Sequence, residues 1–79
     1  MRIGVKILPR NEVLDSQGRA VERTLAHHGK SLESVRVGKY VQLDIDAPTE
    51  EAALEKAKEV AEFVLYNPLI ESYELEVLS

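Results

Sequence analysis

Residues 35–45 read Val35-Arg36-Val37-Gly38-Lys39-Tyr40-Val41-Gln42-Leu43-Asp44-Ile45. Branched or large apolar residues stand at every odd position but one, whereas the even positions hold polar residues or Gly. This period of two is typical of a strand with one buried face. We therefore expect this stretch to form the central and longest strand of a small sheet.

Lys39 interrupts the apolar row, and Gly38 precedes it. Because Gly in a strand allows a bend or the close approach of another backbone, we expect the strand to bend near its middle. An inward Lys39 must stretch its stem over apolar surface and bring its ammonium out at the edge of the helical layer. The alternative is a two-residue hairpin turn at Gly38-Lys39, since Gly at the first loop position suits a type II′ turn.

The residues before this stretch predict one strand and one helix. Apolar and polar residues alternate over residues 2–8, and Pro9 ends the strand. Asp15 can cap a helix of about 13 residues, and Gly29 is a typical helix stop. One face of this helix holds Leu14, Gly18, Val21, Leu25 and His28.

Gly18 lies inside that helical face, where Gly costs about 1 kcal/mol relative to Ala. Such a Gly usually has a packing reason. We expect the backbone of a strand or of a partner to approach closely here. The alternative is a tolerated weak position in the first turn of the helix.

The residues after the opening stretch predict a second helix and a third strand. Thr49 is placed to cap a helix from about Glu50 to Leu65, which ends before Asn67-Pro68. The last strand is expected from Leu69 to Leu78, with alternating apolar positions. The buried stripe of the helix is mostly alanine, so the helix should lie close to the sheet: Ala53, Ala57, Val60, Ala61 and Val64.

The expected order is therefore strand, helix, strand, helix, strand. This order predicts an α+β fold with two layers, in which both helices cover one face of a three-stranded sheet. Helical crossovers allow parallel or antiparallel neighbours, and we favour a ferredoxin-like half with mixed or antiparallel order. We expect residues 1–79 to form a single domain.

Length and charge limit the classes of function. A chain of 79 residues buries only about 60% of its unfolded surface, so self-association is expected. The net charge of −4 argues against a nucleic-acid or anionic-membrane partner. The chain has no Cys, which suits the cytoplasm, and its N-terminal apolar run is too short for a signal or spanning segment.

Few residues carry a pattern that predicts chemistry. His27 and His28 point in different directions on a helix and have no carboxylate at metal-ligand spacing. Glu74 and Glu76 share a strand face, which is more common for solvated charges than for a catalytic pair. Phosphate-loop and nucleophile-elbow motifs are absent from the sequence. We therefore expect no catalytic and no metal-binding residues in this chain.

Three segments resemble, in order and spacing, the small subunit of phosphoribosylformylglycinamidine synthase, the PurS family. They are Val13-Leu14-Asp15-Ser16-Gln17-Gly18-Arg19-Ala20-Val21, Val35-Arg36-Val37-Gly38-Lys39, and Asn67-Pro68-Leu69-Ile70-Glu71-Ser72-Tyr73-Glu74-Leu75-Glu76. The resemblance covers nearly the whole chain. Two positions depart from the family pattern: Ser16 stands where Pro is common, and Tyr66 stands where a small residue is usual.

The resemblance implies a role in de novo purine biosynthesis. Members of this family are expected to be cytoplasmic homo-oligomeric adaptors, dimeric or larger, that join a glutaminase subunit to a large synthetase subunit. The complex is a carbon-nitrogen ligase that amidates formylglycinamide ribonucleotide with ATP and glutamine, and ammonia passes between the active sites. The resemblance implies that ATP and magnesium belong to the synthetase subunit and that this chain binds no cofactor.

The residues expected to meet a partner are Arg36, Lys39, Tyr40 and Asn67. The residues expected to be structural are Asp15, Gly18, Gly38 and Pro68. The alternative function is a free-standing ferredoxin-like regulatory module in which Arg36 and Lys39 hold an anionic ligand.

Overall fold

A computed structural model describes all residues 1–79 of the chain. It contains the five predicted elements in the predicted order, with a short π-helical turn, η1, added to the end of the second helix. The elements are β1 (Arg2–Pro9), α1 (Ser16–His27), β2 (Lys39–Asp44), α2 (Glu50–Val60), η1 (Ala61–Leu65) and β3 (Glu71–Val77). None of these helices is long and apolar enough to cross a membrane.

The sheet has the order β2-β1-β3, and β1 runs antiparallel to both neighbours. Val5 of β1 pairs with Val41 on one side and with Leu75 on the other. The prediction that residues 35–45 form the central and longest strand is therefore wrong, because β2 is an edge strand of only six residues. Residues 35–38 leave the sheet, and the hairpin at Gly38-Lys39 is also wrong because Lys39 begins β2.

The core lies between β1 and the alanine face of α2 and η1. Ile3, Val5 and Ile7 of β1 are almost completely buried. Ala53, Ala57 and Ala61 are fully buried against the sheet, as predicted, and their small side chains allow the helix to approach closely.

Val64 was expected on the same stripe, but it is 66% exposed. The reason is the π-helical turn η1, in which hydrogen bonds span five residues and each turn holds more residues than in an α-helix. The wider turn brings Leu65 into the core in place of Val64.

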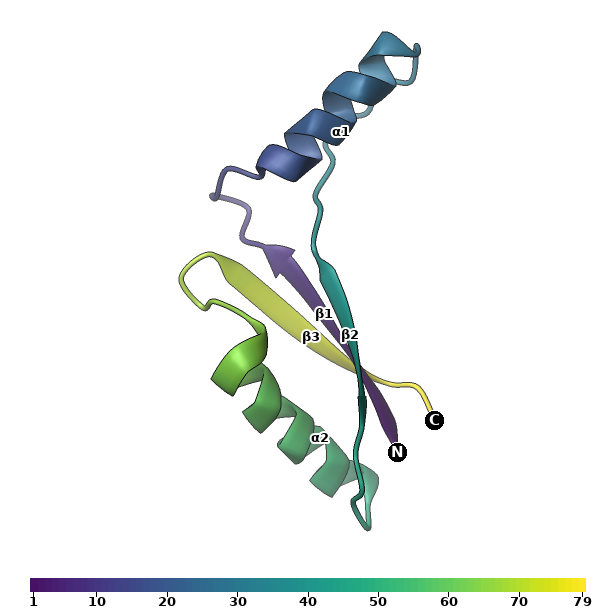
Figure 1. The fold of residues 1–79 in the computed structure, drawn as a ribbon, viewed down its shortest axis with the longest axis vertical. Helices are drawn as coiled ribbons and strands as arrows, with labels where there is room; N and C mark the ends of the chain where they lie inside the picture. Colours follow the sequence, from purple (N-terminus) through teal and green to yellow (C-terminus); the bar gives the residue numbers. More distant parts are fainter.

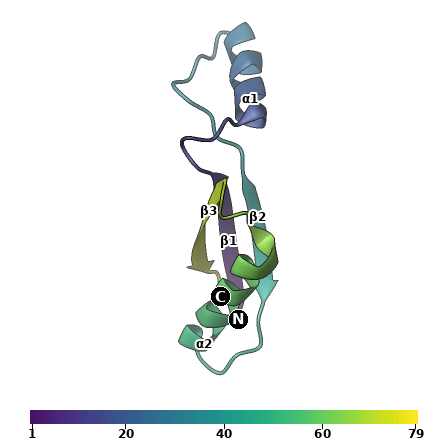
Figure 2. The same cartoon turned by 90° about the vertical axis from the view of Figure 1, so that its left-hand side faces the viewer.

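The α+β class and the three-stranded sheet are confirmed, but the helices are not arranged as expected. Only α2 covers the sheet, and α1 stands beyond the end of the strands (Figures 1 and 2). The prediction that both helices cover one face of the sheet is therefore wrong for the single chain. Helical periodicity predicts an apolar face, but it does not say which chain covers that face.

The molecule is long and thin, with extents of 50 × 26 × 15 Å. Its radius of gyration is 15.7 Å, whereas a compact domain of this length has about 12 Å. The chain divides into two regions, which we call the body (residues 1–9 and 39–79) and the arm (residues 10–38). The arm contains α1 and both connections to the sheet (Figure 1).

Candidate functional site

Polar side chains of α1 and of the segment preceding it hold the helix against residues 35–37, which lead back to the sheet. The Asp15 carboxylate caps α1 by accepting from the Gly18 amide at 3.0 Å, as the sequence predicts, and it also accepts from the Val37 amide at 2.8 Å. These two backbone hydrogen bonds hold the pKa of Asp15 below its ordinary value. Ser16 follows as the first residue of α1, so the helix starts here without a Pro.

Two more α1 residues fix the helix against the return segment. The Glu22 carboxylate accepts from the Val35 amide at 2.8 Å. Gly18 is buried, and a Cβ at this position would collide with the Val35 carbonyl oxygen. The predicted close approach of a backbone at Gly18 is therefore confirmed, and the backbone belongs to the segment that leads into β2.

Arg36 joins this segment to the start of the arm. Its Nη2 donates to the carbonyl oxygens of Pro9, at 3.1 Å, and of Arg10. Its Nε is buried and has no hydrogen-bond partner. We call Asp15, Gly18, Glu22 and Arg36 the clasp: the first three hold α1 against residues 35–37, and Arg36 ties that segment to Pro9 at the end of β1.

Lys39 lies on the helix side of the sheet and emerges at its edge, as predicted. Its ammonium donates to the carbonyl oxygen of Leu65, the last residue of η1, at 3.3 Å. It also lies 3.9 Å from a carboxylate oxygen of Glu71. Arg36 and Lys39 therefore hold different parts of the chain, the arm joint and the C-terminal end of the helical layer.

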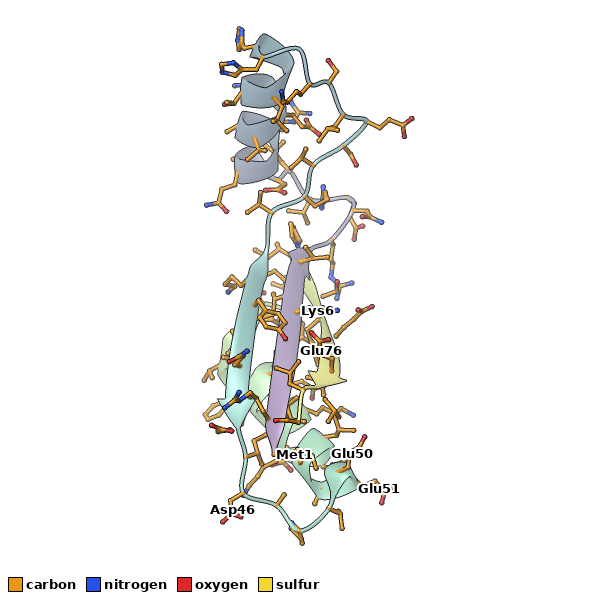
Figure 3. The ribbon with its side chains drawn as sticks, turned by 90° about the vertical axis from the view of Figure 1, so that its right-hand side faces the viewer. Met1, Lys6, Asp46, Glu50, Glu51 and Glu76 are labelled. Carbon is orange, nitrogen blue, oxygen red and sulfur yellow. The ribbon has the colours of Figure 1, made fainter.

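Tyr40 lies on the opposite, open face of the sheet. Its ring covers Gly4, where a Cβ would collide with the ring, and its hydroxyl donates to Glu76 at 2.8 Å. The hydrogen bond to Glu76 raises the pKa of Tyr40. Lys6 lies 3.7 Å from the same carboxylate, so Tyr40, Lys6 and Glu76 form one polar group across the three strands (Figure 3).

Asn67 and Pro68 form the turn between η1 and β3. The Asn67 side chain accepts from the Leu69 amide at 3.0 Å, and the Asn67 amide donates to Glu71 at 2.8 Å. Arg10 donates to the Pro68 carbonyl oxygen at 3.0 Å. The turn is thus tied to the first residue of the arm, which places Asn67 in a structural role in the single chain.

Tyr66, which departs from the family pattern, packs into the second core cluster. Its ring meets Tyr73 edge to face, with the centroids 4.7 Å apart. The Tyr73 hydroxyl donates to Glu62 at 2.8 Å. Burial and this hydrogen bond raise the pKa of Tyr73 to about 12.

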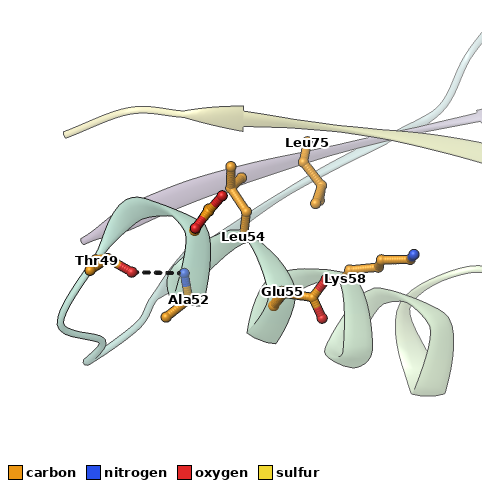
Figure 4. Close-up of a pocket in the computed structure, with 7 residues that line it drawn as sticks. Thr49, Ala52, Leu54, Glu55, Lys58 and Leu75 are labelled. Carbon is orange, nitrogen blue, oxygen red and sulfur yellow. Dashed lines mark hydrogen bonds between the residues drawn. The ribbon is translucent and has the colours of Figure 1, made fainter.

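A shallow groove lies between α2 and β3 (Figure 4). Thr49, which caps α2 through the Ala52 amide at 3.1 Å, lies at one end of it. Two Glu and one Lys line the groove together with Leu54 and Leu75, so its charge does not favour an anionic ligand. His27 and His28 lie at the far end of the arm from this groove, and the chain has no group of three metal-ligating side chains.

The fold and the whole sequence match one family. A family model described as PurS, phosphoribosylformylglycinamidine (FGAM) synthase, matches residues 2–79. The chain belongs to the PurS family. This family provides a subunit of FGAM synthase, so the chain is a subunit of a ligase in purine biosynthesis and the predicted resemblance is confirmed.

Several PurS proteins resemble the chain over nearly its full length. The subunit PurS of Thermotoga maritima is 32% identical, over 98% of this chain and 95% of that protein. The subunit PurS of Bacillus subtilis is 34% identical, over 96% of this chain and 90% of that protein. The crystal structure of PurS from T. maritima superimposes with a TM-score of 0.91 at 32% identity and covers 98% of this chain and 90% of that one.

A second structural neighbour is a chain in the structure of PurLQS from T. maritima. Its TM-score is 0.90 at 31% identity, and the match covers 98% of this chain and 95% of that one. The elongated arrangement of body and arm is therefore shared with solved PurS proteins.

Sequence reasoning missed the carboxylates that hold the structure together. Glu22, which stands one turn after Gly18 and accepts from the Val35 amide, was not singled out from the sequence. Glu71 was read as part of the third strand, although it holds both Asn67 and Lys39. Glu22 could have been found from the sequence, because Asp15, Gly18 and Glu22 are spaced to lie on one side of the helix.

Proposed function

We propose that this chain is the non-catalytic adaptor of its FGAM synthase, joining a glutaminase subunit to a large synthetase subunit. The observation that carries the proposal is the superposition on a chain of PurLQS, with a TM-score of 0.90 over 98% of this chain. A chain that matches so fully can occupy the same position in an assembly of the same composition.

The polar residues of the chain support a structural role. Asp15, Glu22 and Arg36 bind backbone groups at the arm joint, and Tyr40 binds Glu76 on the open face. A catalytic acid, base or nucleophile needs a free group beside a substrate pocket. The groove in Figure 4 has no such arrangement, because its charged residues lie along the open surface of α2.

The partners follow from the same proposal. In the complex, the glutaminase subunit releases ammonia from glutamine, and the synthetase subunit uses ATP and magnesium to amidate formylglycinamide ribonucleotide. This chain binds neither ATP nor magnesium and acts by holding the two subunits together in the cytoplasm. The PurS protein of Methanocaldococcus jannaschii, which is 29% identical to this chain, is one of the subunits of formylglycinamide ribonucleotide amidotransferase in the purine biosynthetic pathway.

Self-association is part of the proposal. The sheet has two edge strands, β2 and β3, and one of its faces has no helix (Figures 2 and 3). Exposed sheet edges and small cores are normally completed by another chain. We therefore expect a dimer or larger oligomer as the form that enters the complex.

The test is reconstitution with the glutaminase and synthetase subunits from the same source. We expect the three chains to co-elute in the presence of ATP, magnesium and glutamine, and glutamine-dependent turnover to require this chain. Turnover with ammonia in place of glutamine should need it less, because free ammonia bypasses transfer between subunits. Equal glutamine-dependent turnover with and without this chain would contradict the adaptor role.

The alternative of an anionic-ligand module gains no specific support. Arg36 already donates to two carbonyl oxygens, and Lys39 is engaged at the end of η1. The two cations do not share a pocket.

A further inference from the structure

One residue, Arg10, connects the arm to the turn that precedes β3. Its backbone amide donates to the Ile70 carbonyl oxygen at 2.8 Å, and its Nε donates to the Pro68 carbonyl oxygen at 3.0 Å. Its own carbonyl oxygen accepts from Arg36 Nη2 and, at 3.0 Å, from the Val13 amide. Arg10 therefore joins its own loop to two segments that lie 26 and 58 residues away in the sequence.

The turn that Arg10 holds is itself a firm part of the body. The Asn67 side chain accepts from the Leu69 amide at 3.0 Å, and the Asn67 amide donates to Glu71 at 2.8 Å. Glu71 also lies 3.9 Å from Lys39 of β2. A hydrogen bond to a carbonyl group of this turn therefore attaches the arm to the body.

The arm has few other contacts that set its direction. The helix α1 stands beyond the end of the strands and does not pack on the sheet or on α2 (Figures 1 and 2). Two stretches of chain connect it to the body, residues 10–15 and residues 28–38, and neither is part of the sheet. Directional hydrogen bonds at the joint therefore hold the angle between arm and body.

Arg10 holds the turn at two points. The hydrogen bond from its amide to Ile70 continues the pairing of β1 with β3, and a chain that leaves a sheet after such a bond can rotate beyond it. The Pro68 carbonyl oxygen provides a second point two residues away, so the side chain adds a direction to the attachment. Arg36 ties the second connecting stretch to the same place through the carbonyl oxygens of Pro9 and Arg10.

We propose that Arg10 is a positioning residue of the adaptor, whose side chain fixes the angle between arm and body and thereby the relative orientation of the two subunits that the adaptor joins. This inference rests on the proposed adaptor function. The molecule is 50 Å long, so a change of angle at the joint displaces its far ends most. A loose joint still allows both subunits to bind, but it aligns them for only part of the time, and ammonia then escapes into water.

Two substitutions separate the hydrogen bond of Arg10 from its charge. Arg10→Met keeps an unbranched side chain and removes both the donor and the charge. Arg10→Gln also removes the charge, but its amide nitrogen stands at the same place along the side chain as Nε and can donate to the Pro68 carbonyl oxygen. Because both variants keep the backbone contacts of residue 10, a difference between them reports the side-chain hydrogen bond.

The angle is measured as a distance between labels on the two regions. The chain has no Cys, so Arg23→Cys on α1 and Lys56→Cys on α2, both at exposed positions, can carry nitroxide labels. Dilution into an excess of unlabelled chain restricts pulsed electron spin resonance to the distance within one copy. We expect a narrow distance distribution with Arg10 and with Arg10→Gln, and one roughly twice as wide with Arg10→Met, because one of two anchoring bonds is lost.

Turnover by the reconstituted complex gives the second readout. Each variant is combined with the glutaminase and synthetase subunits from the same source, and assembly, glutamate and amidated product are measured together. We expect Arg10→Met to assemble and to keep ammonia-dependent turnover, while the ratio of glutamate to amidated product rises roughly threefold or more. Arg10→Gln should keep the ratio of the unmodified chain. A merely structural loss would lower assembly and leave the ratio unchanged.

The two readouts together decide the inference. Equal results for Arg10→Met and Arg10→Gln would overturn it, as would a narrow distribution, an unchanged ratio or lost assembly in Arg10→Met. The unmodified chain tests the proposed function separately. If it does not raise glutamine-dependent turnover, the adaptor role fails, whereas the label distances still show whether Arg10 sets the angle of the arm.

Discussion

The body and the arm are stabilised by different means. The body buries Ile3, Val5 and Ile7 against three alanines and pairs its strands along most of their length. The arm has one buried residue, Gly18, and is held by carboxylates that accept hydrogen bonds from backbone amides. The body is a small core in its own right, whereas the arm is a defined but poorly covered extension.

The difference shows that directional polar contacts can fix a segment without burying it. Asp15 and Glu22 determine where α1 lies relative to residues 35–37, and Arg36 ties that segment to the end of β1. The Schellman hydrogen bonds at the end of α1, from Gly29 to Ala26 and from Lys30 to Leu25, complete the helix. These hydrogen bonds fix the position of α1 relative to residues 35–37, but they leave apolar side chains of the arm, such as Leu14 and Leu32, exposed.

The largest effect should come from the body core. Ile3→Ala removes a fully buried side chain beside Ala53 and Ala57, and we expect a loss of about 2–5 kcal/mol in the free energy of unfolding. That loss is comparable with the whole stability of a chain of this size. Urea unfolding followed by circular dichroism measures it.

The matched control for the core is Leu8→Ala on the same strand. Leu8 is 48% exposed on the open face of the sheet, so its truncation should cost far less. Equal midpoints for the two variants would show that the body core is not where the structure places it.

The same contrast explains how far the sequence could predict the structure. Strict alternation on β1 and alanine spacing on α2 are local consequences of burial, so the body elements were predictable. The position of β2 was not, because residues 35–37 alternate like a strand while their amides bind Asp15 and Glu22. Apolar periodicity predicts that one face of a segment is buried. It does not predict which element covers that face.

The roles of individual residues were predictable only where geometry is local. Asp15 caps the helix that follows it, and Gly29 ends that helix with a φ of +75°, as their spacing predicts. Gly38 was expected to bend a continuous strand; it instead lies just before β2, where a Cβ would collide with the Ile7 carbonyl oxygen. Arg36 could not be placed from sequence, because its partners, Pro9 and Arg10, lie more than 25 residues away.

The next effect concerns the packing of the arm. Gly18→Ala places a methyl group against the Val35 carbonyl oxygen, and we expect a loss of about 1–3 kcal/mol as the helix and return segment separate. Gly29→Ala is the comparison, since it has open space but a left-handed φ, and it should cost about 1–2 kcal/mol without disturbing residues 35–37. Hydrogen exchange at the Val35 and Val37 amides reports arm opening, and it should accelerate in Gly18→Ala only.

Substitutions of Arg36 and Lys39 should have different effects, because Arg36 holds the arm and Lys39 lies in the body. Arg36→Gln removes the hydrogen bonds to Pro9 and Arg10, and we expect the arm amides to exchange faster, with a loss of about 1–3 kcal/mol. Lys39→Gln affects an exposed contact with Leu65 and Glu71 and should cost less than about 1 kcal/mol. Of the two variants, Lys39→Gln should have the larger direct effect on partner binding, because the side chain of Lys39 is largely exposed.

Acid should loosen the arm before the body. The pKa of Asp15 is held below its ordinary 3.8 in the folded chain, so its contribution is present above about pH 4 and is lost as the pH falls through the lowered value. We expect the Val37 amide to lose protection in this range while amides of β1 remain protected. Asp15→Asn should weaken arm protection at neutral pH and remove its part of the acid dependence. Simultaneous loss of protection in arm and body would mean that the two regions unfold together.

The smallest effect is expected at high pH and concerns the body. Burial and the Glu62 hydrogen bond raise the pKa of Tyr73 from 10.0 to about 12. The folded chain therefore holds this proton more tightly, and the stability it contributes is complete below pH 10 and is lost as the pH rises to about 12. Tyr73→Phe keeps the ring against Tyr66 and should flatten the fall of the urea midpoint over that range. Tyr40→Phe on the open face is the comparison. The hydrogen bond to Glu76 also raises the pKa of Tyr40, but less, so this variant should flatten the fall less than Tyr73→Phe, and an equal flattening would contradict the larger share assigned to Tyr73.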